Sequence, residues 1–405
     1  MTTPPTSEAL TEPARVPGDG PLRLLQVGAG GMGRAWLATI AADPDVELVG
    51  LVDLDSDAAR TAADAAGYVD LPVARSLAQL AGPTGAQAVV DVTVPGAHHA
   101  VNTEALLAGL PVLCEKPLSE SLAECLSMVA VAELTGQLLM VSQSRRYWRH
   151  LDRLRSQLAE LGPVGLASCT FARGPRFGGF RETMPYPLLV DMAIHQFDLA
   201  RDLVGSEPVE AFCVSTNPPW SWYAGDATAT AVFRFADGAR FTFDGSWCSP
   251  GQETSWNGAW RLATAEGSAV WDGESAPVAE RTDGSPVPGT GSDAPEQIAG
   301  SLAAFVRALR DGGTPPGEVH GNVLSVAMVD AAIASAEQGR WVRIADLVER
   351  AHAQAVTQEQ RPQVRAVLES WPSAAARVGL APADLAAVGG SGGWPVEHGP
   401  AVAQP

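Results

Sequence analysis

Short apolar runs alternate with helical patterns between residues 22 and 143, and this alternation constrains the fold more than any other feature. A short apolar run bounded by turn residues is typical of a buried strand. Strands separated by helices are joined by crossover connections, which pair neighbouring strands in parallel. The sequence therefore predicts an α/β domain with a doubly wound parallel sheet. Its expected strands cover 22–27, 46–53, 86–95, 111–115 and 137–143, and its expected helices end near 42, 67, 110 and 136.

The rhythm changes after about residue 160, where strand-like runs follow one another with few helical patterns between them. In the run "FADGARF", an Asp-Gly pair separates two such stretches, which is a strong hairpin signal. We therefore expect a second α/β domain, residues 144–348, with an open and mostly antiparallel sheet. A helix over 189–205 lies between its first strands, the segment 276–295 is expected to be a loop, and further helices are expected at 296–311 and 322–338.

The two ends of the chain differ from the rest in composition. Residues 1–20 contain Pro, Thr and Gly but neither a basic segment nor an apolar one, so we expect a disordered leader rather than a signal peptide. Residues 349–405 are expected to form an extension that is partly helical and then flexible. The parallel-sheet domain is accordingly placed at residues 21–143.

The net charge and the cysteines limit the partners and the compartment. The 405 residues have a formal charge of −19 and a pI near 4.7. Such a surface repels nucleic acids and anionic membranes, so neither is expected as a partner. We also expect no apolar run long enough to span a bilayer. The five cysteines are odd in number and lack metal-ligand spacing, which is typical of free thiols in a reducing compartment, so a cytoplasmic location is expected.

The stretch "LLQVGAGGMGRAW" places Gly28, Gly30 and Gly33 in the spacing G-x-G-x-x-G, between a predicted strand and a predicted helix. The first glycine permits a tight turn, the second lets backbone amides approach a pyrophosphate, and the third lets the helix pack on the strand. Asp53 ends the next strand 20 residues after Gly33, where its carboxylate would bind the adenosine ribose and repel a 2′-phosphate. This favours NAD over NADP as cofactor. The alternative is a glycine-rich turn without a ligand.

Two further stretches carry ionisable groups where a ligand could lie. "LCEKPL" ends a predicted strand, and ligands of open parallel sheets bind beyond the carboxyl ends of the strands. Lys116 would stand there near a nicotinamide, although an exposed Glu115–Lys116 pair is an equally simple interpretation. In "LVDMAIHQFD", Asp191 and His195 are one turn apart and share a helix face, and burying them without partners would be costly. A surface pair on that helix is the alternative, and Asp198 is expected to pair structurally.

These motifs resemble, in their order, those of the glucose–fructose oxidoreductase/inositol dehydrogenase (Gfo/Idh/MocA) family. They are "VGAGGMG", "VDLD", "VPGAHHA", "LCEKPL", "SRRY" and "DMAIHQFD", and the resemblance covers roughly residues 22–345. It implies a Rossmann domain, a second domain with an open sheet, bound NAD or NADP, and a sugar, cyclitol or polyol substrate. The family's catalytic lysine, Asp and His match Lys116, Asp191 and His195. Further cofactor contacts are expected within the motifs, at Met32, Pro95, His99 and Glu115.

The chemistry expected of these residues is hydride transfer between nicotinamide and a secondary alcohol or ketone. His195 would act as general base on a substrate hydroxyl, Lys116 would hold the same oxygen, and Asp191 would hydrogen-bond the substrate or the imidazole. No third ligand accompanies Asp191 and His195, so no metal is expected. Two other functions stay open: an NAD-dependent glycoside hydrolase with transient ring oxidation, and a non-catalytic NAD or sugar sensor. A homodimer or homotetramer is implied by the resemblance alone.

Overall fold

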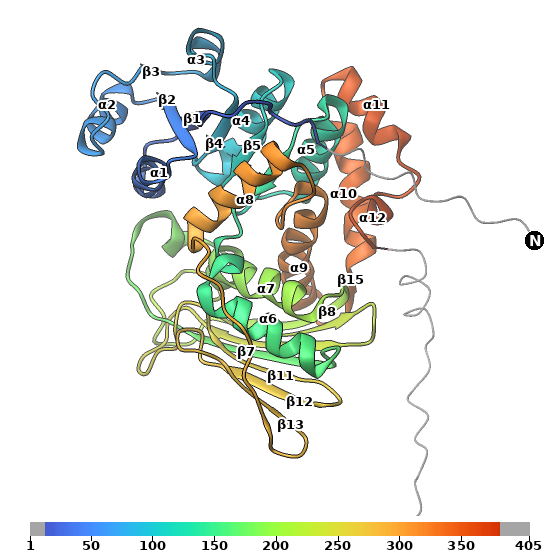
Figure 1. Ribbon diagram of the computed structural model, residues 1–405. Helices are drawn as coiled ribbons and strands as arrows, with labels where there is room; N and C mark the ends of the chain where they lie inside the picture. The colour runs from blue at the N-terminus through green and yellow to red at the C-terminus, as the bar shows by residue number, and fades with distance from the viewer. Residues whose placement is uncertain (1–12, 381–405) are drawn as a thin grey trace, which may run out of the picture.

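The computed structural model describes residues 13–380 and contains two sheets, one above the other in Figure 1. The first sheet has six strands in the order β3–β2–β1–β4–β5–β6, and every pair is parallel, which confirms the predicted doubly wound domain. Its central strands are buried because one apolar cluster forms on each face of the sheet. The strands are β1 (Leu22–Val27), β2 (Val46–Val52), β3 (Val73–Ala74), β4 (Ala88–Asp91), β5 (Val112–Cys114) and β6 (Leu139–Val141). The helices between them are α1 (Gly31–Ala42), α2 (Ser56–Ala65), α3 (Leu77–Thr84), α4 (Pro95–Leu107) and α5 (Leu122–Thr135).

The sequence patterns did not predict β3 or α3 at the edge of this sheet. A strand of two residues has no periodicity to detect, and α3 contains Pro83, which interrupts a helical pattern. The signal that was present is a capping box, in which Ser76 and Gln79 satisfy the backbone groups at the start of α3. Short edge elements of this kind are held by local hydrogen bonds rather than by a hydrophobic stripe.

The second sheet has nine strands in the order β14–β13–β12–β11–β7–β10–β9–β8–β15. Within it, β10 and β7 pair in parallel and the other pairs are antiparallel, as predicted. β13 and β14 lie in the segment 276–295, so the expectation of a loop there was wrong. Both are short edge strands in a Pro- and Gly-rich sequence, which hides the alternation of buried and exposed residues. The strands are β7 (Leu166–Ala172), β8 (Pro208–Thr216), β9 (Thr228–Phe235), β10 (Arg240–Ser246), β11 (Ala259–Ala263), β12 (Gly267–Trp271), β13 (Val278–Arg281), β14 (Pro286–Val287) and β15 (Val342–Arg343).

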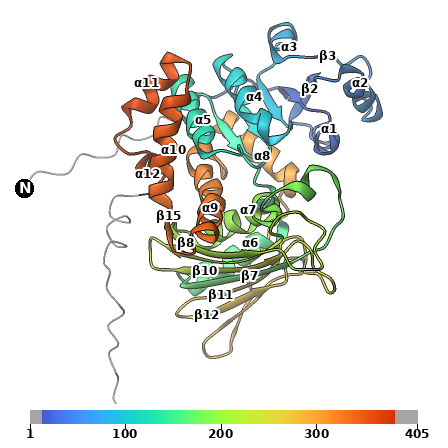
Figure 2. The same cartoon turned by 180° about the vertical axis from the view of Figure 1, so that it is seen from behind.

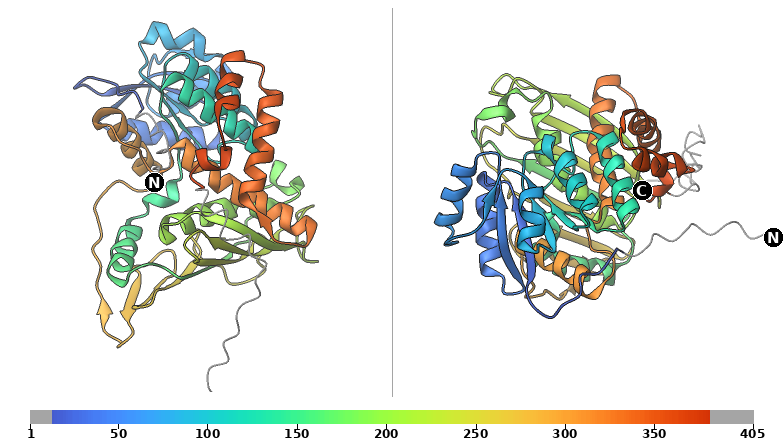
Figure 3. Two further views of the ribbon diagram at one scale, coloured as in Figure 1. Left: turned by 90° about the vertical axis from the view of Figure 1, so that its right-hand side faces the viewer. Right: turned by 90° about the horizontal axis from the view of Figure 1, so that it is seen from above.

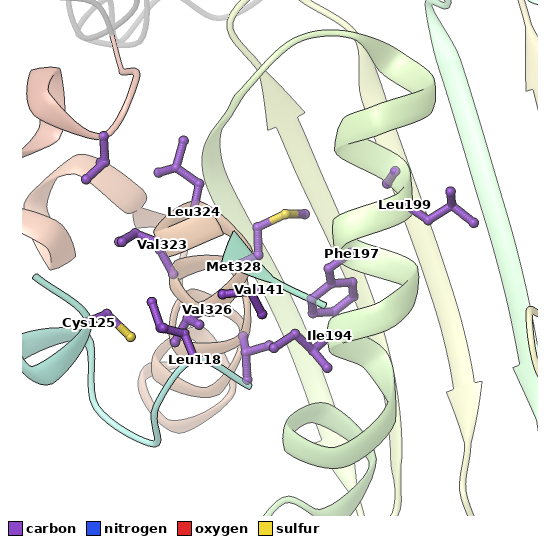
Figure 4. Packing of buried hydrophobic residues seen from close by; sticks show 14 of the residues in the cluster. Leu118, Cys125, Val141, Ile194, Phe197, Leu199, Val323, Leu324, Val326 and Met328 are labelled. Atoms are coloured by element: carbon purple, nitrogen blue, oxygen red, sulfur yellow. The ribbon is translucent and has the colours of Figure 1, made fainter. Parts of the chain in front are cut away.

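Three helices lie between the two sheets and cover the inner face of the second one, as Figures 1 and 2 show. They are α6 (Arg149–Leu161), α7 (Ile194–Val204) and α9 (Val319–Gln338). Figure 4 shows residues of α9 clustered with Leu118 and Val141 of the first domain and with Phe197 of α7. α8 (Gln297–Asp311) instead joins the apolar cluster of the first domain, where Phe305 belongs with Trp36. Residues late in the chain therefore hold the two domains together.

The helix α9 has the length and composition of a membrane span, so the expectation that the chain has no such apolar run was wrong. The helix has 20 residues, and a stretch of 18 of them has a mean hydropathy of 1.3, but 67% of that stretch is buried inside the protein. The helix is apolar on most sides because it packs against β8, α7, α5 and α10 at once. Its composition is that of a central core helix.

The C-terminal extension packs beside the first domain as α10 (Ile344–Gln358), α11 (Pro362–Ser370) and α12 (Ala374–Arg377), which Figure 3 shows in red and orange. Glu133 of α5 accepts hydrogen bonds from Trp371 Nε1 at 3.0 Å and Arg377 Nε at 2.5 Å, and contacts His320 Nε2 at 2.9 Å. Burial alone would raise the pKa of Glu133, but these donors lower it to about 2. The extension is thus fixed to the first domain through a buried charge.

The terminal segments lie largely outside the described residues. The flexible tail expected near the C-terminus falls within 381–405, and most of the expected leader falls within 1–12, so neither is described. Residues 13–20 contain no helix or strand, but hydrogen bonds hold this part of the expected leader against the folded protein. The amide of Ala14 donates to the carbonyl of Gly136, and that of Val16 donates to the carbonyl of Leu309. These bonds use carbonyls at the ends of α5 and α8, which have no partner within the helix.

A carboxyl group on α9 should make stability depend on pH. Burial raises the pKa of Asp330 to about 7, and the described residues give it neither a hydrogen bond nor an ion pair. The pKa of Asp330 is higher in the folded than in the unfolded protein. Ionisation of this carboxyl group therefore lowers the free energy of unfolding as the pH rises from about 4 to 7, and the loss is complete above pH 7. We expect Asp330→Asn to raise the free energy of unfolding by roughly 2–4 kcal/mol at pH 8 and hardly at all near pH 4. Urea unfolding at both pH values tests this, with the exposed Asp64→Asn as control; an equal gain at both values would contradict it.

Candidate active site

The glycine loop between β1 and α1 is shaped by close backbone contacts. Gly28 has φ of 101°, and a Cβ there would lie 2.6 Å from the carbonyl oxygen of Val92. A Cβ on Gly33 would lie 2.4 Å from the carbonyl oxygen of Gly28. Gly30, in contrast, is exposed and has no atom near its missing Cβ. Two glycines are therefore required by packing, and the third leaves the backbone open at the N-terminus of α1, where a pyrophosphate fits.

Asp53 follows β2 at the same edge and holds the loop in place. Its Oδ2 accepts a hydrogen bond from the amide of Ala29 at 2.8 Å, and its Oδ1 accepts one from the amide of Asp55 at 2.9 Å. Three large apolar side chains are exposed shortly after the ends of β1, β2 and β4: Met32 is 50% exposed, Leu54 76% and Val94 67%. Met32 was among the expected cofactor contacts, whereas Leu54 and Val94 were not. An apolar residue just beyond a strand end is the signal, because such surfaces suit the flat rings of a dinucleotide.

The structure does not bring His99 into this site. His99 Nε2 lies 3.1 Å from Ser127 Oγ, on the side of α4 that faces α5. His98 instead lies beneath the loop of residues 115–118 after β5, which carries Lys116 and is called the lysine loop below. His98 Nδ1 lies 2.8 Å from the carbonyl oxygen of Pro117, and its Nε2 lies 3.2 Å from that of Thr93. Adjacent side chains of a helix point about 100° apart, so only one of two consecutive histidines can face the site. The sequence "HH" does not indicate which one it is. Pro95, also expected to contact the cofactor, is half-buried as the first residue of α4.

Glu115 supports the site from below rather than facing a ligand. Its side chain is buried, Oε1 accepts a hydrogen bond from Trp36 Nε1 at 2.8 Å, and Oε2 accepts one from the amide of Lys116 at 3.1 Å. Burial raises the pKa of Glu115. Both oxygens are engaged within the protein, so Glu115 ties α1 to the lysine loop, and its contact with the cofactor stays a prediction.

Lys116 and Asp191 meet across the two domains. Lys116 follows β5, and its Nζ donates to the carbonyl oxygen of Asp191 at 3.1 Å and lies 3.6 Å from Asp191 Oδ1. Asp191 lies in a π-helical turn, Leu188–Ala193, which leads directly into α7. Such wide turns are rare and are frequently found at functional sites. The sequence pattern predicted the helix but not the wider turn.

His195 lies in the first turn of α7 and is 6% exposed. Burial first, and then the charges of Lys116 and Arg145, lower the pKa of His195 well below its usual value. Its Nδ1 has no hydrogen-bond partner, and no hydrogen bond joins it to Asp191 among the residues described. The imidazole is therefore neutral at neutral pH and able to accept a proton. Of the roles expected for Asp191, contact with the imidazole is not seen.

Arg145 is a site residue that sequence reasoning missed. It belongs to the 3₁₀ turn Ser144–Tyr147 that follows β6, and its Nη1 donates to Asn257 Oδ1 at 2.9 Å. Burial lowers the pKa of Arg145 to about 10. Asp198 lies apart from this group, since it pairs with Arg146 at 2.6 Å and accepts a hydrogen bond from Ser325. The site thus gathers Lys116, Arg145, Asp191 and His195, and Asp198 is structural, as expected.

One buried cluster has the residue types of a metal site. Asp91, His98 and Cys114 bring one ligand-type atom each to within 4.8 Å of one another. Both nitrogens of His98 already contact carbonyl oxygens, and Asp91 Oδ1 accepts hydrogen bonds from the amide and hydroxyl of Thr93. The imidazole therefore has no nitrogen to offer a cation, and we assign no metal site there.

Comparison with known proteins agrees with this geometry. Residues 22–143 match the family model of the Gfo/Idh/MocA oxidoreductases with an NAD-binding Rossmann fold, and residues 156–270 match the model of the family's C-terminal domain. The chain is 28% identical to D-apiose dehydrogenase of Paraburkholderia graminis over 351 residues, which covers 79% of this chain and 88% of that protein. It is 34% identical to inositol 2-dehydrogenase of Corynebacterium glutamicum over 195 residues, or 46% and 56% of the two chains.

Solved structures share the fold at lower identity. An oxidoreductase from Agrobacterium radiobacter, solved with NAD⁺, L-tartaric acid and magnesium, superposes with a TM-score of 0.72 at 20% identity. The match covers 80% of this chain and 99% of that one. A levoglucosan dehydrogenase solved with NADH gives a TM-score of 0.69 at 18% identity, with 80% and 99% coverage. The chain therefore belongs to the Gfo/Idh/MocA family and is an NAD-binding oxidoreductase, a dehydrogenase whose first domain is the Rossmann fold.

Proposed function

We propose that this protein transfers a hydride between nicotinamide and a secondary alcohol or ketone of a sugar, cyclitol or related polyol. The observation that carries the proposal is the meeting of Lys116 from the first domain with Asp191 and His195 from the second, beyond the carboxyl end of β5. Ligands of doubly wound sheets bind at this edge. The named relatives act on a sugar and on inositol, which supports the same class of substrate here.

The composition of the chain supports the role of Lys116. Of the 27 lysine and arginine side chains, Lys116 is the only lysine. Arginine is planar and keeps its charge at every accessible pH, whereas lysine is a compact point charge on a flexible stem and can lose its proton. A chain that uses arginine at every other basic position but lysine at this one indicates that the site requires a primary amine. The glycine loop and Asp53 supply the matching cofactor site.

Different side chains of the protein act on the reacting oxygen of the substrate and on the proton of its hydroxyl group. Bound NAD supplies the acceptor or donor of the hydride. Lys116 Nζ donates a hydrogen bond to the substrate oxygen and stabilises negative charge that develops on it. His195, held neutral by burial, accepts the hydroxyl proton during oxidation and returns it during reduction. Asp191 fixes the ammonium of Lys116 and accepts a hydrogen bond from a neighbouring hydroxyl of the polyol.

We also propose that copies of the chain assemble through the open face of the second sheet. The face away from the helices carries the exposed apolar side chains Leu166, Val214, Val270 and Val278. A patch of this kind on a sheet is typical of an interface. Leu166→Arg should therefore lower the molar mass measured by light scattering, whereas a single-chain mass of 42.1 kDa for the unchanged protein would contradict the proposal.

A panel of sugars, cyclitols and polyols tests the proposed reaction. The purified protein is incubated with each compound and NAD or NADP, and NADH or NADPH formation is followed by absorbance. Net NADH from one compound class, with little NADPH, supports the proposal. Cleavage of an aryl glycoside without net NADH indicates the hydrolase, and NAD binding with neither reaction indicates a sensor.

A further inference from the structure

The carboxylate of Asp191 is shared between two cations from different parts of the chain. Its Oδ1 faces Lys116 Nζ at 3.6 Å, and its Oδ2 accepts a hydrogen bond from Arg181 Nε at 2.7 Å. The Asp191 side chain is 13% exposed, so both interactions act where water screens them little. Each oxygen therefore has one cationic neighbour, and the Arg181 contact is the shorter of the two.

Arg181 reaches Asp191 from a segment that is anchored at several points. It lies in the 3₁₀ turn Gly179–Thr183, and its guanidinium stacks 4.8 Å from the centre of the Phe180 ring and 5.8 Å from that of Phe177. The carbonyl oxygen of Glu182 accepts a hydrogen bond from the amide of Ala224 at 2.8 Å. Aromatic faces and a neighbouring loop thus hold the planar guanidinium in one orientation.

We propose that Arg181 is the positioning residue of this active site: it holds Asp191 Oδ2 so that Oδ1 faces Lys116 and the substrate. This inference rests on the proposed function, since it adds a residue to the same reaction. Arg181 contacts Asp191 and not the reacting atoms, so it acts through that carboxylate. No sequence motif marks the role, because Arg181 is 10 residues from Asp191 and outside the helix.

The physical need for Arg181 follows from what Lys116 would do without it. With Arg181 removed, Lys116 is the one ammonium within reach of Asp191, and the carboxylate is free to turn both oxygens toward it. The ammonium would then be engaged by Asp191 instead of the substrate oxygen. A misplacement of about 1 Å at a reacting group costs on the order of 100-fold in rate, so we expect a loss of that size in kcat.

The same loop offers a matched control. Arg176 stacks over the ring of Trp222 at 4.0 Å, and no carboxylate of the described residues pairs with it. Arg176→Gln removes one positive charge from the loop, as Arg181→Gln does, but leaves Asp191 untouched. Arg181→Lys keeps a charge without the planar fork and should retain part of the function.

The first measurement needs no turnover. Because Lys116 is the only lysine, a sample grown on [ε-¹³C]lysine gives a single side-chain NMR signal. We expect Arg181→Gln to shift that signal clearly at pH 7 and Arg176→Gln, which also contains a single lysine, to leave it in place. A signal unchanged in Arg181→Gln, or shifted as much in Arg176→Gln, would overturn the proposal.

The second measurement is kinetic and uses the polyol that gives most NADH. We expect kcat of Arg181→Gln to fall about 100-fold, the Kd of NAD to change less than twofold, and added guanidinium chloride at millimolar concentration to restore part of kcat. A merely structural role would not respond to guanidinium. A kcat of Arg181→Gln within threefold of the original would overturn the proposal. If no polyol gives NADH, the proposed function fails alone, because the lysine signal still decides the role of Arg181.

Discussion

The Lys116→Arg variant is expected to lose about 1000-fold in kcat while it keeps its affinity for NAD. The charge survives, but the longer planar guanidinium cannot occupy the place of Nζ, 3.1 Å from the carbonyl oxygen of Asp191. Removing one donor aimed at a developing oxyanion typically costs roughly 100- to 1000-fold, and a guanidinium in the wrong place also blocks the substrate. The largest loss should therefore appear in kcat rather than in cofactor binding.

This result is measured by steady-state NADH formation together with the quenching of tryptophan fluorescence by NAD. Arg350→Lys, on the exposed surface of α10, is the control for exchanging the two basic side chains, and it should behave as the original protein. A Lys116→Arg protein with more than a fifth of the original kcat would show that any cation suffices, and the role given to the amine would be wrong.

The His195→Gln variant is expected to lose about 1000-fold in kcat, within the range that general bases contribute. Glutamine can hydrogen-bond but cannot accept the hydroxyl proton. His150→Gln on α6 is the matched control and should keep full activity. If His195→Gln retains a tenth of the original rate, the proton must leave by another route.

The pH dependence of the unchanged protein follows from the same residue. A base acts when it is neutral, and the pKa of His195 lies well below its usual value because of burial and the charges of Lys116 and Arg145. The oxidation rate should therefore not fall between pH 8 and about 6.5, where an ordinary histidine would begin to protonate. A decline centred near pH 6.5 that disappears in His195→Gln would show that the imidazole is more exposed than this structure has it.

The elements that the sequence predicted well are those with a strong local pattern. A stretch of about a dozen residues is enough to recognise each of three elements. These are the glycine loop, the buried strand β1 and the helical segment that carries Asp191 and His195. Gly28 and Gly33 are required here by close backbone contacts, and their spacing, together with the strand before them and the helix after them, predicted the turn. The same locality explains why β3 and β14, with two residues each, were missed.

The parts of the site that could not be predicted depend on distant segments coming together. Arg181 reaches Asp191 only because the loop before α7 folds back, and Arg145 reaches the site only because β6 ends beside β5. Glu115 was expected to face the cofactor, yet the indole of Trp36, 79 residues earlier, takes one of its oxygens. His98 faces the lysine loop and His99 faces α5, because the two side chains lie on different sides of α4. No local sequence pattern indicates which side of α4 faces the lysine loop.

The central claim is that one substrate carbon loses its hydrogen to nicotinamide while Lys116 and His195 act on its oxygen. The most direct measurement uses the polyol that gives most NADH, deuterated at the carbon to be oxidised, and examines the NADH formed by mass spectrometry. We predict one deuterium in each NADH, together with a slower rate for the deuterated polyol in the unchanged protein. NADH without deuterium, or formed equally well by the Lys116→Arg, His195→Gln double variant, would contradict the account.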